Sequence, residues 1–230
     1  MKRFYKEARV RPGAEGGEVL LDERPVKTPA RRPLALPTEP LAKAVAAEWN
    51  AQGDQVRPRT MPLTGLANAA IDRVAPDKEA FAANLAQYGE SDLLCYRADG
   101  PASLAARQTA LWDPILAWAR RRFDVNFTVT TGIMHQKQPA DTVVQLSQAT
   151  ASRDAFELAA LSPLVTISGS LLIALALAEE AIDLETAWAA ATLDETWQAE
   201  QWGQDEEATA RLDARRAEFE AAERFLRLLR

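Results

Sequence analysis

A run of acidic and aromatic side chains near the carboxyl end of the chain is its densest collection of groups that could do chemistry. Residues 193–208 hold six acidic residues and two tryptophans, in two expected helices joined at Gly203. If the first helix extends back to Trp188, then Trp188, Glu195 and Trp202 recur every seven residues on one face. A carboxylate between two large apolar rings is either partly buried and hydrogen-bonded, or lies in a groove that another molecule enters.

Paired carboxylates can bind a hard cation or carry out acid–base chemistry. Glu90 and Asp92 lie two residues apart, while Asp194, Glu195 and Asp205 all belong to the acidic run. Most acidic residues with such spacing cap helices or face solvent. We therefore expect neither a metal site nor a catalytic site from these residues.

Several common catalytic and cofactor-binding signatures are missing from the sequence. Because His135 is the only histidine and Cys95 the only cysteine, one chain can form neither a disulfide nor a Cys/His zinc site. A nucleophilic pair of these two residues is arithmetically possible, but a cysteine in an apolar run is usually an inert core residue. The sequence also lacks a P-loop, a dinucleotide fingerprint and a nucleophile elbow. We expect no cofactor, no bound nucleotide and no metal.

The overall composition is that of an ordinary soluble globular protein. The chain has 230 residues, of which 47% are hydrophobic and 26% charged. A net charge of −6 argues against a general nucleic-acid binder, which would carry a basic stripe. Charge is nevertheless uneven: residues 1–33 hold nine basic and five acidic residues, whereas residues 193–230 hold ten acidic residues and six arginines. The single cysteine fits a reducing compartment.

Neither a targeting signal nor a membrane span is expected. The basic residues at the start are not followed by an apolar run, and the segment lacks the serine-rich, acid-free character of a transit peptide. Residues 161–178 form the one uncharged stretch near membrane length. This stretch contains polar and small residues and is followed by two glutamates, which favours a buried core helix over a membrane span.

The secondary structure predicted from the sequence changes from β-like to helical near residue 76. Glycine and proline separate short β-like runs over residues 4–36, which predicts antiparallel strands. Thr38 is expected to cap the helix that follows. We therefore predict an α+β protein, with a small β-containing N-terminal domain (1–76) followed by a mainly α-helical C-terminal domain (77–230).

Two places in the C-terminal domain stay ambiguous. Leu93–Tyr96 could be a strand or a buried helical turn, and either it or the predicted strand Phe127–Thr131 could join the N-terminal sheet. Pro114 should kink or break its helix, unless a new helix starts there with Asp113 as its cap. Every segment of residues 140–230 is expected to be helical, with the last helix beginning at Asp205.

The tryptophans have two possible roles. Trp49 lies on the apolar side of its predicted helix and should pack between that helix and the sheet. The others are most simply core residues, although tryptophan is also a favoured anchor of protein interfaces, so some could be exposed in a binding groove. These others include Trp112, Trp118, Trp188, Trp197 and Trp202.

Seven blocks of residues, in order along nearly the whole chain, resemble a known protein family. The blocks are Lys2–Lys6, Leu21–Pro29, Ala47–Gln52, Met61–Thr64, Asp92–Arg97, Gln108 with Trp112–Pro114, and Asp194–Glu195 through Trp202–Asp205. Each block alone is weak evidence for a family, but seven blocks in the same order are specific evidence for one. The chain resembles the assembly chaperones for the α subunit of the F₁ sector of ATP synthase, known in mitochondria as F₁ complex assembly factor 2.

The resemblance implies a chaperone rather than an enzyme. Such a protein binds the free α subunit, its client, and keeps it soluble until it assembles with the β subunit. The resemblance also implies a functional role for Glu195, the acid of an Asp-Glu-x-x-Trp-Gln motif. Asn50 departs from the family, in which aspartate is commoner, and the missing transit peptide makes the chain similar to the bacterial, cytoplasmic form. We expect client-binding roles for Glu195, Asp194, Trp197, Gln198, Trp202 and Asp205, and structural roles for Trp49, Trp112 and Asp113.

Two other functions remain open. One is an enzyme that acts on a small polar substrate through the carboxylates around Glu195. The other is a plain structural subunit of a stable complex. The sequence does not indicate which surface of the α subunit is bound, how the client is released, or the oligomeric state.

Overall fold

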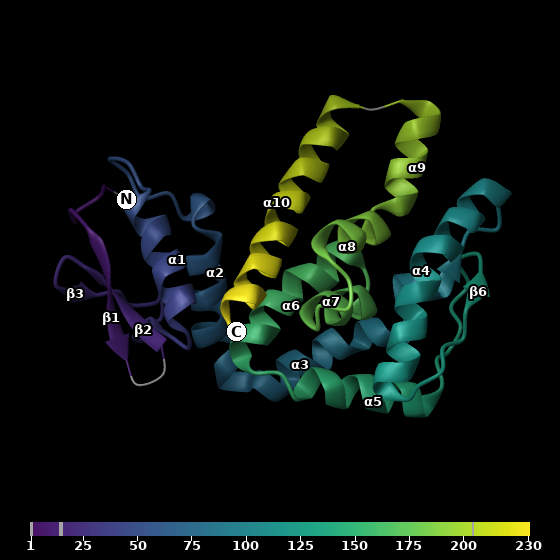
Figure 1. The fold of residues 1–230 in the computed structure, drawn as a ribbon, viewed down its shortest axis with the longest axis horizontal. Coiled ribbons are helices and arrows are strands. Elements are labelled where there is room, and N and C mark those ends of the chain that lie inside the picture. Colours follow the sequence, from purple (N-terminus) through teal and green to yellow (C-terminus); the bar gives the residue numbers. More distant parts are fainter. Residues whose placement is uncertain (1, 14–15, 204) are drawn as a thin grey trace. The chain divides into compact units, whose positions relative to one another are not determined.

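The computed structural model describes residues 2–13, 16–203 and 205–230, and confirms an α+β fold (Figure 1). The chain forms two compact units. The first unit contains the chain up to Lys78 together with residues 154–160 and 224–230, and the second contains residues 79–153 and 161–223. The domain boundary near residue 76 stays a prediction.

The strands of the first unit form a small antiparallel sheet around β2 (Gly16–Leu21). Strand β1 (Ala8–Gly13) pairs with β2 along its whole length, and the short strands β3 (Arg24–Pro25) and β4 (Ala35–Leu36) also pair with β2. Alternate residues of β2 are buried, as expected for a strand with one face against a core. The predicted antiparallel strands are therefore confirmed.

Helix α1 (Glu39–Asn50) packs against β1 and β2. The hydroxyl of Thr38 accepts a hydrogen bond from the N–H of Leu41 at 3.3 Å, so the predicted cap is confirmed. Leu41 and Val45, one turn apart, are fully buried, and they supply the apolar stripe that the sheet covers.

A carboxylate at the end of α1 also caps the start of α2 (Pro62–Ala69). The two oxygens of Glu48 accept the N–H groups of Leu63 and Thr64, each at 2.8 Å, and Oε2 also accepts the Thr64 hydroxyl at 2.7 Å. These N–H groups have no partner within their own helix, and the helix dipole favours a negative charge there. Glu48 therefore fixes α2 against α1.

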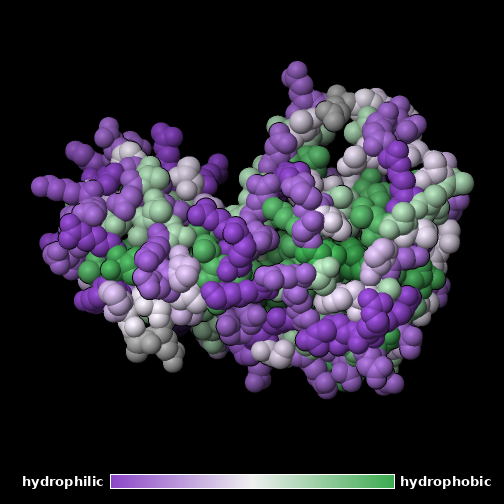
Figure 2. Space-filling view, in the orientation of Figure 1, coloured by the Kyte–Doolittle hydropathy of each residue, from purple (hydrophilic) through white to green (hydrophobic). Residues whose placement is uncertain are grey.

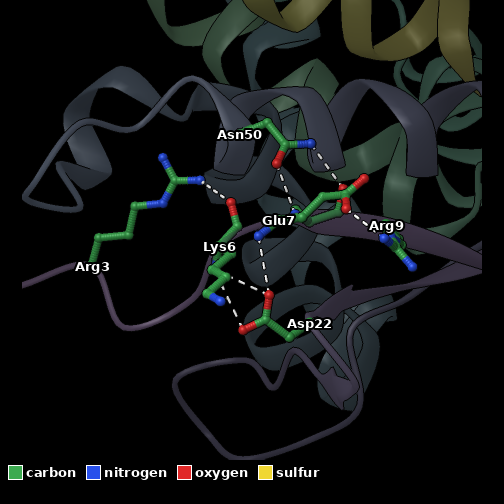
Figure 3. A network of polar contacts seen from close by, with 7 residues as sticks. Arg3, Lys6, Glu7, Arg9, Asp22 and Asn50 are labelled. Atoms are coloured by element: carbon green, nitrogen blue, oxygen red, sulfur yellow. Dashed lines mark hydrogen bonds and ion pairs between the residues drawn. The ribbon is translucent and has the colours of Figure 1, made fainter.

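Polar contacts fasten the N-terminal segment to the sheet (Figure 3). Asp22, in the turn after β2, accepts the N–H groups of Lys6 and Glu7, both at 3.1 Å. These two hydrogen bonds lower the pKa of Asp22 from its ordinary value. Arg3 donates to the carbonyl of Lys6 at 2.6 Å, so the chain before β1 is held on both sides.

Asn50 covers the outer edge of β1 at Ala8. Its Oδ1 accepts the N–H of Ala8 at 2.7 Å, and its Nδ2 donates to the carbonyl of Ala8 at 2.8 Å. An ionised aspartate here could accept the first hydrogen bond but could not donate the second. The side-chain amide of Asn50 therefore closes part of an otherwise open sheet edge.

The side chain of Trp49 is half-buried and packs edge-on against the ring of Tyr5, with the ring centroids 5.7 Å apart. The hydroxyl of Tyr5 donates to the Trp49 carbonyl at 2.6 Å. Among the described residues, the enclosed indole N–H of Trp49 has no hydrogen-bond partner. The ring therefore lies at the margin of the first unit's core rather than in its centre.

Trp49→Arg is expected to lower the free energy of unfolding by about 2 kcal/mol, roughly half the cost of losing a fully buried aromatic ring. The physical reason is the loss of the edge-on contact with Tyr5 and of the half-buried indole surface. Urea denaturation measures the change, with Trp49→Phe as a control that keeps an aromatic edge. A Trp49→Arg protein that unfolds at the same urea concentration as the original would contradict a structural role.

The second unit is built almost entirely of helices. A few of these helices have one end in the residues that belong to the first unit. Its fully buried centre is α7, in which every residue is buried, and α4 and α8 pack against it. The helices from α3 onward are α3 (Lys78–Ala86), α4 (Ala102–Phe123), α5 (Ala140–Ala151), α6 (Ala155–Ser168), α7 (Leu171–Ala178), α8 (Leu184–Ala191), α9 (Leu193–Trp202) and α10 (Glu206–Leu228). Shorter helical turns lie at Pro58–Thr60, Ala70–Val74, Ala75–Asp77, Gln87–Glu90 and Leu93–Cys95.

The apolar stretch 161–178 forms parts of two helices rather than one. Helix α6 ends at Ser168, Gly169 adopts a left-handed backbone (φ +68°), and the hydroxyl of Ser170 caps α7 by accepting the N–H of Ile173 at 3.0 Å. Most of the stretch is buried, as expected for a core segment. No helix in the described part of the chain has the length and apolar character needed to span a bilayer.

Two sequence expectations for this unit need correction. Of the two alternatives for Leu93–Tyr96, the helical turn is present at Leu93–Cys95. Strand β5 (Tyr96–Arg97) follows and pairs in parallel with β6 (Thr130–Thr131) in a separate two-stranded sheet, not in the N-terminal sheet. The predicted strand Phe127–Thr131 is therefore reduced to its last two residues. Helix α4 runs through Pro114 without a break, because buried residues on both sides of Pro114 hold the helix against its neighbours.

Candidate functional site

The arrangement of Trp188, Glu195 and Trp202 differs from the one predicted. Helix α8 ends at Ala191 and α9 begins at Leu193, because the backbone of Thr192 between them is not helical (φ −115°, ψ 13°). Trp188 is 7% exposed, whereas Trp202 is 76% exposed. The prediction that these three side chains share one helix face is wrong.

Helices α9 and α10 instead form a hairpin that encloses a groove of about 480 Å³. The predicted junction at Gly203 is confirmed, since α9 ends at Trp202 and Gly203 takes a left-handed φ of +90°. The groove brings together four of the predicted client-binding residues, which are Glu195, Gln198, Trp202 and Asp205. Its other lining residues are Ala199, Gly203, Ala208, Thr209, Arg211, Leu212 and Arg215.

Glu195 crosses the groove to form an ion pair with Arg215 on α10. One guanidinium nitrogen, Nη1, donates to both carboxylate oxygens at 2.8 and 3.0 Å, and Nη2 donates to the carbonyl of Ile167 at 3.0 Å. The side chain of Glu195 is 50% exposed. Glu195 is therefore both hydrogen-bonded and in a groove, so the two alternatives left open by the sequence hold together.

Two of the predicted client-binding residues, Asp194 and Trp197, are not among the residues that line the groove. Asp194 does not line it: its carboxylate accepts the side-chain amide of the buried Gln108 at 2.8 Å. Trp197 packs edge-on against Trp202 at 5.9 Å. Asp205 accepts the N–H of Glu207 at 3.3 Å through its side chain, which makes it a capping residue of α10 as well as a groove residue.

The family of the chain follows from comparison with known proteins. The model of the ATP12 chaperone protein family matches residues 2–120. This chain belongs to the ATP12 chaperone family. The family comprises assembly chaperones for F₁-ATPase. The mitochondrial protein atp12 of Schizosaccharomyces pombe is 26% identical to it over an alignment of 221 residues, which covers 90% of this chain and 75% of that protein.

Solved structures extend the likeness to the whole chain. Crystallised Atp12 from Paracoccus denitrificans is 44% identical, has a TM-score of 0.94, and aligns with 100% of this chain and 98% of its own. A mutant of the same Atp12p, with lysine in place of one aspartate, is also 44% identical, with a TM-score of 0.95 and the same coverage. The α9–α10 hairpin therefore lies inside the region of likeness, although the family model stops at residue 120.

Trp112 and Asp113 both contact Arg97 in this ATP12-family chain. The ring of Trp112 is 1% exposed, and its N–H donates to the carbonyl of Ala190 at 3.0 Å. The guanidinium of Arg97 lies over this ring, 5.1 Å from the centroid, and donates to Asp113 at 2.6 Å. These contacts join α4 to the end of α8, directly before α9 begins.

The other predicted carboxylate pair does not form a site. Glu90 is exposed, whereas Asp92 is fully buried and accepts the N–H groups of Leu94 (3.1 Å) and Leu172 (3.0 Å) and the hydroxyl of Ser170 (2.7 Å). Asp92 thus caps the short turn that follows it and the start of α7. Within the described ranges, no group of three or more His, Cys, Asp or Glu side chains could hold a metal ion.

Asp92 should give the protein a measurable dependence of stability on pH. Burial raises its pKa from 3.8 to about 6, although its hydrogen bonds oppose the shift. Because the folded pKa is raised, the stabilising contribution is fully present below about pH 4 and is lost as the pH rises through 6. The loss amounts to at most about 3 kcal/mol. Relative to an Asp92→Asn variant, the original protein should lose stability between pH 4 and 7 in urea denaturation; parallel curves for the two proteins would contradict this.

Cys95 and His135 do not form a nucleophilic pair. Cys95 is fully buried, and burial raises the pKa of its thiol to about 12, so the thiolate is scarce at neutral pH. His135 is exposed, and its Nδ1 lies 3.1 Å from the hydroxyl of Tyr96. The reading of Cys95 as an inert core residue therefore agrees with its surroundings.

Sequence reasoning missed Arg215 as a groove residue. Arg215 lies twenty positions after Glu195, and only the reversal of chain direction at Gly203 brings the two together. Counting outward from Gly203 pairs Glu195, eight residues before it, with Arg211, eight residues after it, so the count alone does not find Arg215.

Proposed function

We propose that this ATP12-family protein is an assembly chaperone that binds the free α subunit of F₁-ATPase and keeps it soluble until the β subunit joins it. The observation that carries the proposal is the α9–α10 groove, with Trp202 exposed at its rim and the Glu195–Arg215 pair across it. A subunit awaiting its partner exposes a large apolar surface that tends to aggregate. An exposed tryptophan beside a groove is a suitable anchor for such a surface.

Glu195 supports client binding in this proposal in two ways. Its ion pair with Arg215 fixes the separation of α9 and α10, and Arg215 also holds the end of α6 through Ile167. The half-exposed carboxylate in addition presents negative charge to the client. The two contributions can be separated by exchanging the charges of the pair.

An enzyme that uses the carboxylates around Glu195 has less support. Glu195 is ion-paired, Asp194 accepts a hydrogen bond from Gln108, and Asp205 caps a helix, so each carboxylate already has a structural partner. We propose that the protein has no catalytic activity. We also propose that it acts in a bacterial cytoplasm, in view of its likeness to Atp12 from Paracoccus denitrificans.

The test is co-expression with an α subunit that aggregates when it is made alone. We expect the α subunit to remain soluble and to co-purify with the chaperone, and to pass into a complex when β subunit is added. An α subunit that precipitates equally with and without the chaperone would overturn the proposal. Equimolar chaperone in purified, assembled ATP synthase would instead favour a structural subunit.

A further inference from the structure

The part of the α9–α10 hairpin around Gly203 carries a one-sided negative charge, whereas the remainder of α10 contains four arginines, Arg215, Arg216, Arg224 and Arg227. Residues 193–213 contain seven acidic residues and one basic residue, Arg211. Three consecutive acidic residues, Asp205, Glu206 and Glu207, are exposed where α10 begins, and we call them the acidic rim. Glu207 pairs with Arg211, but both side chains are more than 60% exposed, so this pair is screened by solvent.

The interior of the groove is apolar, whereas its edges are charged. Ala199 and Trp202 contribute from α9, and Ala208 and Leu212 contribute from α10. Figure 2 shows hydrophobic residues in the hollow between these two helices, with hydrophilic residues along the outer edges. Trp202, which leaves 76% of its surface exposed, has no place in a core and is available to a partner.

We propose that the groove binds one amphipathic helix of the client, with an apolar stripe that enters the groove and lysine or arginine residues that face the acidic rim. This inference rests on the proposed function. The walls of the groove are themselves helices, and a third helix can pack against both through ridges and grooves. The ten residues of α9 span about 15 Å, which matches apolar residues at positions i, i+3 or i+4, and i+7 of the bound helix.

A second copy of this chain is a poorer occupant of the groove. Two such hairpins would bring two copies of the acidic rim into one interface, and like charges across an interface oppose association. A basic partner relieves the same charge. The charge of the hairpin therefore selects a partner of a different kind rather than a homodimer.

The experiment uses the full chain and fluorescein-labelled, overlapping 20-residue peptides that cover the α subunit, with binding followed by fluorescence anisotropy. We expect the binding peptides to be net positive, to have the helical apolar spacing, and to gain helical circular dichroism on binding. Neutralising the acidic rim (Asp205→Asn, Glu206→Gln, Glu207→Gln) should weaken binding about tenfold at low salt and flatten its salt dependence. Trp202→Ala should weaken binding about tenfold at every salt concentration.

A matched control neutralises three exposed acidic residues outside the hairpin, Glu90→Gln, Asp99→Asn and Asp141→Asn, and should bind as the original does. Asp205→Asn keeps a good capping residue, so the rim variant is expected to fold. If intact α subunit fails to bind the original chain, the proposed function fails and this inference with it. If intact α subunit binds all the variants equally, if the binding peptides are acidic or extended, or if Trp202→Ala dissociates a homodimer, the inference is overturned while the proposed function stands.

Discussion

Glu195→Lys is expected to abolish protection of the free α subunit while leaving the chaperone folded. The substitution replaces the ion pair with Arg215 by two like charges at the groove. Because Glu195 is half-exposed, the stability cost should stay below about 1 kcal/mol. Loss of the fixed groove and reversal of its charge should together remove most of the affinity for the client. Thermal unfolding and the soluble fraction of co-expressed α subunit measure the two effects.

Glu200→Lys is the matched control for this prediction. Glu200 is also an exposed, ion-paired glutamate on α9, but its partner is Arg107 and it does not line the groove. We expect Glu200→Lys to protect the α subunit nearly as the original does. Full protection by a folded Glu195→Lys protein would remove Glu195 from the site, although not the protein from its family.

Exchanging the charges separates the two contributions of Glu195. In the double variant Glu195→Lys with Arg215→Glu, an ion pair can form again across the groove. If the fixed separation of α9 and α10 is what matters, the double variant should recover much of the protection. If the client contacts the negative charge of Glu195 directly, the double variant should remain as inactive as Glu195→Lys alone.

Local chemistry made the ends of helices predictable. The cap at Thr38 and the junction at Gly203 were both read correctly, because a hydroxyl that accepts a nearby N–H and a glycine with positive φ act within a few residues. The α+β character followed in the same way from glycine and proline spacing in the first part of the chain.

Features that depend on distant contacts were not predictable in this way. The shared face of Trp188, Glu195 and Trp202 required an unbroken helix, and the sequence gives no strong sign that the chain turns at Thr192. In the opposite direction, Pro114 indicated a break where tertiary packing keeps α4 continuous. The spacing of apolar residues shows which side chains share a helix face only if the ends of that helix are already known.

The residues that carry the family resemblance are mostly ones that hold the fold together. Asp22 and Asn50 fasten the N-terminal segment within the first unit. Gln108 joins Asp194, and Asp92 caps α7, within the second. A block of similar sequence therefore does not by itself mark a binding surface. The groove residues differ from these in lining a hollow between two antiparallel helices, and that placement depends on the chain reversal at Gly203.

Trp112→Ala is expected to have the largest effect on stability, lowering the free energy of unfolding by about 3–5 kcal/mol. The ring is 1% exposed, so its removal leaves a cavity between α4 and its neighbours. It also leaves the carbonyl of Ala190 and the face of Arg97 without their partners. Urea denaturation measures the loss, and hydrogen exchange should show it in α4 and α8.

Trp112→Phe divides this cost into its parts. Phenylalanine keeps much of the packing and a ring face for Arg97, but it cannot donate to Ala190, so we expect a loss of only about 1–2 kcal/mol. At a temperature where Trp112→Ala remains folded, it should still protect the α subunit, since Trp112 does not line the groove. A folded Trp112→Ala protein that binds no client would mean that the groove depends on the position of Ala190, directly before α9, more closely than its own contacts indicate.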